Sequence, residues 1–224
     1  MVRVNWCCGI LAAIAIGQGV FSIETIQSSP WNSILESFSR RPKPPLGGRT
    51  DFCAISPRRL PDGIERTSGD RLLFVWNGMI SKIEVHAEKV KEPLWSQLVN
   101  PDARQAKYTG FPLVAGARYE WWIFNRFAVN ETEPSLRVPF HVIESSERDR
   151  MALELADLNS QIRNTKKWVS AEEWSRKRSQ YFISQGLFVD AMREILSVQR
   201  SSQELRTIWQ NLPIDLCRRE ENKS

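Results

Sequence analysis

The chain has 224 residues, enough for one large domain or two small ones, and too many for a scaffold that depends on several disulfides to fold. Its net charge of +5 is mild, and the basic residues are spread along the sequence in small clusters. Nucleic-acid binders usually concentrate such charge in one stripe, so we expect no nucleic-acid partner. Nine tryptophans accompany only three tyrosines, and an exposed tryptophan would mark a recognition surface.

Residues 1–22 have the pattern of a secretory signal peptide. Arg3 is followed by an uncharged, mostly apolar stretch from Cys7 to Phe21, which is the order of regions in such signals. An uncleaved segment would tether the protein to a membrane through its N-terminus, although a spanning helix needs about 20 apolar residues. A buried N-terminal helix is the remaining alternative. The sequence therefore favours export to the periplasm or cell envelope.

Residues 23–50 are predicted to form a linker. The stretch from Pro30 to Phe38 has room for one or two turns of amphipathic helix, and the prolines and glycines of residues 42–48 then interrupt regular structure. Such a linker would hold the folded part away from a membrane or a neighbouring surface.

Removal of the signal segment leaves two cysteines, Cys53 and Cys217. An even number of cysteines in an exported protein suggests a disulfide. It would close almost the whole mature chain into one loop, which the chain-entropy model credits with about 5 kcal/mol. Two unrelated buried thiols are the alternative. Two cysteines and two histidines show no ligand spacing, so we expect no metal site and no cofactor.

Residues 51–143 contain short β-rich runs separated by turn residues. Close spacing without intervening helices favours an antiparallel β-sandwich. The Asn77-Gly78 pair predicts a hairpin turn after the first of the six main runs. The six are Leu72–Trp76, Ser81–Ala87, Leu94–Val99, Gln105–Thr109, Tyr119–Asn125 and Leu136–Val142, and Phe52–Ile55 is expected to supply a seventh strand.

The segment Leu113-Val-Ala-Gly-Ala-Arg-Tyr119 resembles the Leu-x-Pro-Gly-x-x-Tyr corner of fibronectin type III and related immunoglobulin-like domains. The resemblance implies that Leu113 packs in the core, that Gly116 allows a tight corner and that the Tyr119 hydroxyl bonds back to the upstream backbone. Ala115 replaces the usual proline. We therefore expect an immunoglobulin- or fibronectin III-like sandwich.

Residues 144–217 have helical periodicity and residues 218–224 form a tail. Helices are predicted to begin at Ser146, Ser170 and Ser201, each followed three residues later by an acidic residue. The last helix should end before Pro213. The segment Gln185–Ala191 resembles the inter-helix turn of a tetratricopeptide hairpin. Because solenoids need about three repeats, we expect one helical hairpin docked on the sandwich.

No motif for catalysis stands out in the sequence. There is no Gly-rich phosphate loop, no His-Glu-x-x-His and no Gly-x-Ser-x-Gly. Alternation places His86 and His141 at outward positions of their strands, where solvated surface is the expected role. No catalytic or cofactor-binding residue is therefore assigned.

The strand Tyr119–Asn125 holds the candidate partner surface. If Tyr119 and alternate residues face the core, then Trp122 and Phe124 point outward and need a cover. We expect the C-terminal helices to supply it through Trp174, Phe182 or Trp209. If those helices pack elsewhere, Trp122 and Phe124 become the leading candidates for a partner or ligand surface.

Several short strings of the chain resemble an uncharacterised family of exported cyanobacterial proteins. These are Pro45–Arg49, Phe52–Pro57, the Tyr-x-Trp strand, Arg137–Phe140 and Leu216-Cys217. The resemblance implies an exported protein and adds no mechanism. Our first hypothesis is a non-catalytic binding or scaffolding module of the periplasm or cell envelope, with an envelope protein or a glycan as partner. An envelope hydrolase with a site assembled from scattered residues and a membrane-anchored accessory protein are the alternatives.

Overall fold

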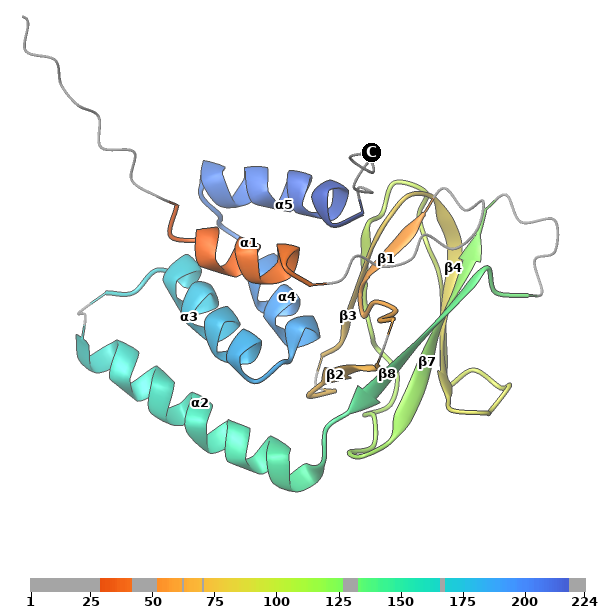
Figure 1. Ribbon diagram of the computed structural model, residues 1–224, viewed down its shortest axis with the longest axis horizontal. Helices are drawn as coiled ribbons and strands as arrows, with labels where there is room; N and C mark the ends of the chain where they lie inside the picture. Colours follow the sequence, from red (N-terminus) through yellow and green to blue (C-terminus); the bar gives the residue numbers. More distant parts are fainter. Residues whose placement is uncertain are drawn as a thin grey trace, which may run out of the picture.

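The computed structural model describes residues 29–41, 52–61, 63–69, 71–126, 133–165 and 168–217 (Figure 1). The predicted signal segment 1–22 and tail 218–224 lie outside these ranges. The helices are α1 (Asn32–Ser39), α2 (Ser145–Thr165), α3 (Ala171–Ser184), α4 (Phe188–Leu196) and α5 (Gln203–Cys217). The strands are β1 (Cys53–Ser56), β2 (Glu65–Thr67), β3 (Leu73–Asn77), β4 (Ile80–Ala87), β5 (Trp95–Leu98), β6 (Gln105–Lys107), β7 (Arg118–Asn125) and β8 (Leu136–Val142).

The strands form two sheets, as predicted for a sandwich followed by helices. The three-stranded sheet has the order β1-β3-β6 and the five-stranded sheet has the order β2-β8-β7-β4-β5. All pairs are antiparallel except β2 with β8. The seven predicted strands are present. The sequence did not predict β2, because Glu-Arg-Thr is short and has no apolar alternation.

The turn at Asn77-Gly78 does not form a hairpin, so that prediction is wrong. Strand β3 pairs with β1 and β6, whereas β4 pairs with β5 and β7. Gly78 has a φ of 100° and turns the chain from one sheet into the other. The turn signature predicts a reversal of the chain, but whether the flanking strands pair depends on where their apolar faces are buried.

Strand β3 is buried on both of its faces. Phe74 and Trp76 pack between the two sheets, whereas Leu73 and Val75 pack against the helices. All four are at most 4% exposed. Burial on both faces explains why this strand is a continuous apolar run. The molecule therefore has three layers, the helices, the three-stranded sheet and the five-stranded sheet (Figure 1).

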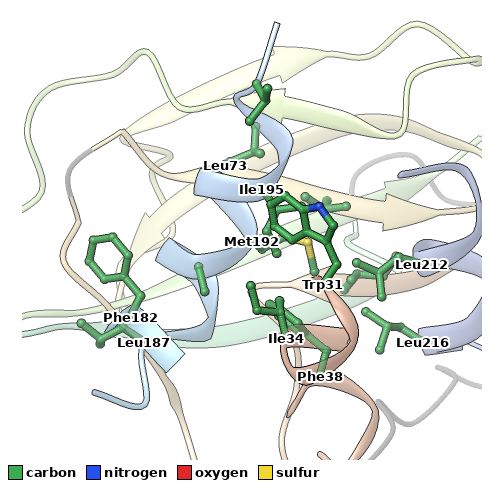
Figure 2. Close-up of a cluster of buried hydrophobic side chains, with 14 of the residues drawn as sticks. Trp31, Ile34, Phe38, Leu73, Phe182, Leu187, Met192, Ile195, Leu212 and Leu216 are labelled. Carbon is green, nitrogen blue, oxygen red and sulfur yellow. The ribbon is translucent and has the colours of Figure 1, made fainter. Parts of the chain in front are cut away.

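Helix α1 lies in the predicted linker but is part of the core. Trp31, Ile34 and Phe38 are at most 3% exposed. They lie among side chains of α4 and α5, including Met192 and Leu212 (Figure 2). The spacing of three and four residues gives α1 one apolar face, and the other helices bury that face. This part of residues 23–50 is therefore not a tether.

A disulfide between Cys53 and Cys217 joins β1 to the end of α5, which confirms the predicted pairing. The two Cα atoms are 6.1 Å apart, and the cysteines are separated by 164 positions in the sequence. That distance lies within the usual range for disulfides. The bond fastens the helical layer to the three-stranded sheet.

Helix α5 differs from its prediction at both ends. Its first turn is capped by Ser202, whose Oγ accepts from the Leu205 N–H at 3.2 Å, and not by Ser201. The helix continues through Pro213 to Cys217. Pro213 removes one backbone donor, but the buried Leu216 and the disulfide hold the last turn against the core.

The α3–α4 hairpin and the corner before β7 both turn at glycines in the left-handed region. Gly186 has a φ of 72°, and Gly116 has a φ of 76°. The Val114 N–H donates to the Tyr119 hydroxyl at 2.8 Å across the corner, and Leu113 is 5% exposed. The hydrogen bond from Val114 to Tyr119 fixes the path of the chain into β7.

Candidate functional site

The three-stranded sheet lies between the five-stranded sheet and the helices (Figure 1). Trp122 and Phe124 lie on the outer face of the five-stranded sheet, because the alternate residues Trp121 and Ile123 pack in the core between the sheets. The expected cover by the C-terminal helices is wrong. Phe182 and Trp209 pack within the helical core, and Trp174 lines a cleft described below. The helices pack instead against apolar side chains of β1 and β3, such as Ile55 and Leu73.

Neighbouring strands supply the cover instead. Lys82 Nζ lies 3.9 Å from the centroid of the Phe124 ring, and Phe124 is 4% exposed. The Trp122 indole stacks on His86 of β4 at 3.7 Å and lies 4.2 Å from the Arg137 guanidinium of β8. Cation–π contacts of this kind stabilise a sheet surface. Trp122 is half-buried, and it stays a predicted partner residue with Phe124.

His86 is 1% exposed, so the expectation of a solvated histidine is wrong for this residue. Its Nε2 lies 2.9 Å from Glu84 Oε2, and its Nδ1 lies 3.3 Å from the Val90 carbonyl oxygen. Glu84 also pairs with Lys82 at 2.9 Å. Burial alone would raise the pKa of Glu84, but hydrogen bonds from Lys82 and His86 outweigh it and hold the pKa below the ordinary 4.5.

A cleft of about 1030 Å³ lies between the sandwich and the helices, and six of its lining residues are basic. One wall comes from β3, β6 and the residues beside them, and the other comes from α2, α3, α4 and the segment after α4. The charged lining residues are Arg71, Lys107, Arg163, Arg178, Arg193, Arg200 and Glu194.

Two of the cleft arginines are matched by carboxylates. Arg178 donates to both oxygens of Glu194 at 3.0 and 3.1 Å. Arg193 lies 3.3 Å from Glu194 and 3.2 Å from Asp190. Glu194 is thus fully engaged, and it leaves no acidic group in the lining for the remaining cations.

Four cations of the cleft have no such partner. Arg71, Lys107, Arg163 and Arg200 are exposed, and none forms an ion pair with a carboxylate among the described residues. They come from the turn before β3, from β6, from the last turn of α2 and from the connection between α4 and α5. Unmatched positive charge in a cleft attracts anions and raises their local concentration.

Neutral side chains complete the cleft. Trp174 and Tyr108 provide aromatic surface, and Leu73, Leu196 and Val198 provide apolar surface. The Arg163 guanidinium lies 6.0 Å from the Trp174 ring centroid, at the outer limit of a cation–π contact. The cleft therefore combines cations with flat apolar surface.

A buried carboxylate next to the cleft residue Arg193 joins α4 to the chain after β2. Asp190 of α4 is 1% exposed and accepts from the Ser68 N–H at 2.9 Å and from the Ser68 hydroxyl. Burial raises the pKa of Asp190, and the nearby Arg193 and the bonds from Ser68 oppose that rise. Asp190 therefore couples α4, one side of the cleft, to the chain after β2.

The four unmatched cations were not found from the sequence. They lie at positions 71, 107, 163 and 200, so no window of the sequence contains a basic stripe. The only local signal is that Arg163 lies in the last turn of α2. The tertiary fold brings these residues together.

Neither His86 nor His141 lines the cleft or a second cavity of about 530 Å³ beside β8. Within the described ranges there is no group of three or more histidines, cysteines or acids that could hold a metal ion. None of the helices in that part of the chain is long and apolar enough to cross a bilayer. Comparisons with protein-family models, curated proteins and solved structures find no match to this chain.

Proposed function

We propose that this protein is a non-catalytic binding module of the periplasm or cell envelope, and that the basic cleft holds an anionic ligand. The observation that carries the proposal is the convergence of Arg71, Lys107, Arg163 and Arg200 on one cleft, where none of them forms an ion pair with a carboxylate of the described residues. Three of the four are arginines, whose planar guanidinium groups bind carboxylate, sulfate or phosphate oxygens in pairs.

The hydrolase alternative has less support. It would need His86 or His141 in a polar cavity, and both contact groups of the sheet instead. His141 Nε2 lies 3.2 Å from the Gly116 carbonyl oxygen, and His86 is held by Glu84. These contacts favour structural roles for both histidines.

The proposed compartment is supported by the Cys53–Cys217 disulfide, since such bonds persist in oxidising environments. The resemblance of residues 1–22 to a signal peptide also supports export. Fractionation of the native cells and N-terminal sequencing of the mature protein test this. A mature chain that begins near Ile23 in the periplasm supports export, and an intact N-terminus in the membrane fraction supports the anchored alternative. A reduced protein in the cytosol would contradict both.

We further propose that the sandwich is immunoglobulin- or fibronectin III-like and that the α3–α4 hairpin is tetratricopeptide-like. The bond from Val114 to the Tyr119 hydroxyl supports the first relationship. The left-handed Gly186 and the fully buried Ala191, which lies where the two helices pack, support the second. An experimental structure compared with both fold families tests the assignments.

Calorimetric titration with dextran sulfate at low salt tests the cleft. The double variant Arg163→Glu/Arg200→Glu should weaken binding at least 30-fold, because it reverses two of the four cations. The matched control Lys91→Glu/Arg126→Glu reverses two exposed cations that do not line the cleft, and it should weaken binding less than threefold. Equal weakening by the two variants, or no binding by the wild type, would contradict the proposal.

A further inference from the structure

We infer that the ligand of the cleft is a segment of an acidic polysaccharide, a chain of sugar rings that carry carboxylate or sulfate groups. This inference rests on the proposed function, because it names the class of anion that the cleft binds. It is drawn from the distribution of charge over the two walls and from the neutral groups between the cations.

The charge is divided between the two walls. Arg71 and Lys107 belong to the sandwich, and Arg163 and Arg200 belong to the helical layer. A ligand that neutralises groups on both walls must carry anionic groups at several positions along its length. A polymer with one carboxylate or sulfate on each ring meets this requirement.

The aromatic lining suits the uncharged body of such a chain. Trp174 and Tyr108 are both half-buried, with ring surface in the cleft. The C–H groups on one face of a sugar ring pack well against an aromatic ring, because they are apolar and slightly positive whereas the ring face is negative. Leu196 and Val198 add apolar surface to the lining.

The polar lining offers side-chain amides that accept as well as donate hydrogen bonds, Asn159 among them. Sugar hydroxyls can donate to such groups, whereas ionised carboxylate and sulfate groups only accept. Gln105, Thr109 and Gln199 are further hydrogen-bonding groups in the lining.

The size of the cleft is consistent with several linked rings. Its volume of about 1030 Å³ lies at the upper end of the range of roughly 300–1,000 Å³ usual for small-molecule sites. The disulfide supports export to an oxidising compartment. An exported protein can encounter acidic polysaccharides there.

The test is a calorimetric comparison of charge-matched oligomers. Oligogalacturonate and sulfated oligodextran should bind at least tenfold more tightly than polyglutamate or oligothymidylate, and neutral oligodextran should not bind. Comparison of the first two probes tells carboxylate-bearing from sulfate-bearing chains. A preference for polyglutamate would indicate an acidic protein partner and overturn the inference, and a preference for oligothymidylate would overturn it in favour of a nucleic acid.

Substitution of the aromatic wall separates this inference from the proposed function. Trp174→Ala should weaken oligosaccharide binding at least fivefold and change polyglutamate binding less than twofold. Trp168→Ala is the matched control, since Trp168 is 87% exposed and does not line the cleft. If Trp174→Ala does not fold, Trp174→Leu removes the ring and keeps the apolar volume.

The outcomes are distinguishable. Equal affinity for all anionic oligomers, with no selective effect at Trp174, would overturn the polysaccharide and leave anion binding in place. A wild-type protein that binds none of the anionic probes would overturn both proposals.

Discussion

The outer face of the five-stranded sheet and the basic cleft both hold cations close to aromatic rings, but they use them differently. On the outer face, Lys82 lies 3.9 Å from the Phe124 ring, and Arg137 lies 4.2 Å from the Trp122 ring. In the cleft, the closest such contact of the unmatched cations is that of Arg163 with Trp174, at 6.0 Å. Cations that contact an aromatic ring or a carboxylate stabilise the fold, whereas cations without such a contact are available to an anion. The candidate site is therefore identified by what its basic residues contact, and not by how many there are.

The largest expected effect concerns the bond between α4 and the chain after β2. Asp190→Ala should lower the free energy of unfolding by about 3 kcal/mol, because it removes a buried carboxylate that Ser68 and Arg193 contact. It should also weaken dextran sulfate binding, since α4 loses its bond to the sandwich. Chemical denaturation and titration measure the two effects. A loss below about 1 kcal/mol with unchanged binding would show that other contacts hold α4 on the sandwich.

The next largest effect is expected at Trp122, on the outer face of the five-stranded sheet. Trp122→Ala should cost about 2 kcal/mol of stability, because it removes the stack on His86 and the contact with Arg137. Binding of dextran sulfate should not change. Phe111→Ala, at an aromatic residue that is 87% exposed, is the control and should stay within about 0.5 kcal/mol. Lost binding with intact stability would identify Trp122 as a ligand residue.

A smaller effect depends on pH. The folded-state pKa of Glu84 is below 4.5, so the folded protein holds this proton less tightly than the unfolded chain does. Its stabilising contribution is therefore present above pH 4.5 and is lost as pH falls through the folded value. The stability advantage of the wild type over Glu84→Gln should shrink between pH 6 and pH 3 in denaturation curves. If the stability advantage of the wild type grows as the pH falls, then burial outweighs the hydrogen bonds in setting the pKa of Glu84.

The smallest effect is expected in the cleft itself. Lys107→Glu and Arg200→Glu should each change the free energy of unfolding by no more than about 0.5 kcal/mol, because neither cation has an ion-pair partner among the described residues. Thermal and chemical denaturation at low salt measure this. Destabilisation above 1 kcal/mol would mean that these cations serve the fold, and the contrast between the two regions would disappear.

Alternation of apolar residues was sufficient to predict the main strands and their buried faces. Ile83, Val85, Trp121 and Ile123 are all buried between the sheets, as period two requires. Alternation did not predict the burial of His86. It indicates on which side of a sheet a residue lies, but not which other residues cover that side. The cover comes from Trp122 and from the loop that contains Val90.

The helical layer and the cleft could be predicted only in part. The stripe of Trp31, Ile34 and Phe38 was visible as an amphipathic turn, but nothing local shows that α4 and α5 would bury it. The cleft depends on how whole layers dock, and its cations lie far apart in the sequence. Residues that meet only through docking leave no periodic pattern.

The bond between Cys53 and Cys217 also determines how the molecule responds to pulling. A force applied at the two chain ends passes through the two sulfur atoms and bypasses the residues between the cysteines, whose separation is 164 positions. At about 3.5 Å per extended residue, the chain between the two cysteines has a contour length of roughly 570 Å, and this length cannot be pulled out until the bond is reduced. Helix α1 precedes Cys53, so it would be the first element to peel from its neighbours. Under tension, an oxidised molecule would release one short helix and keep its sheets closed.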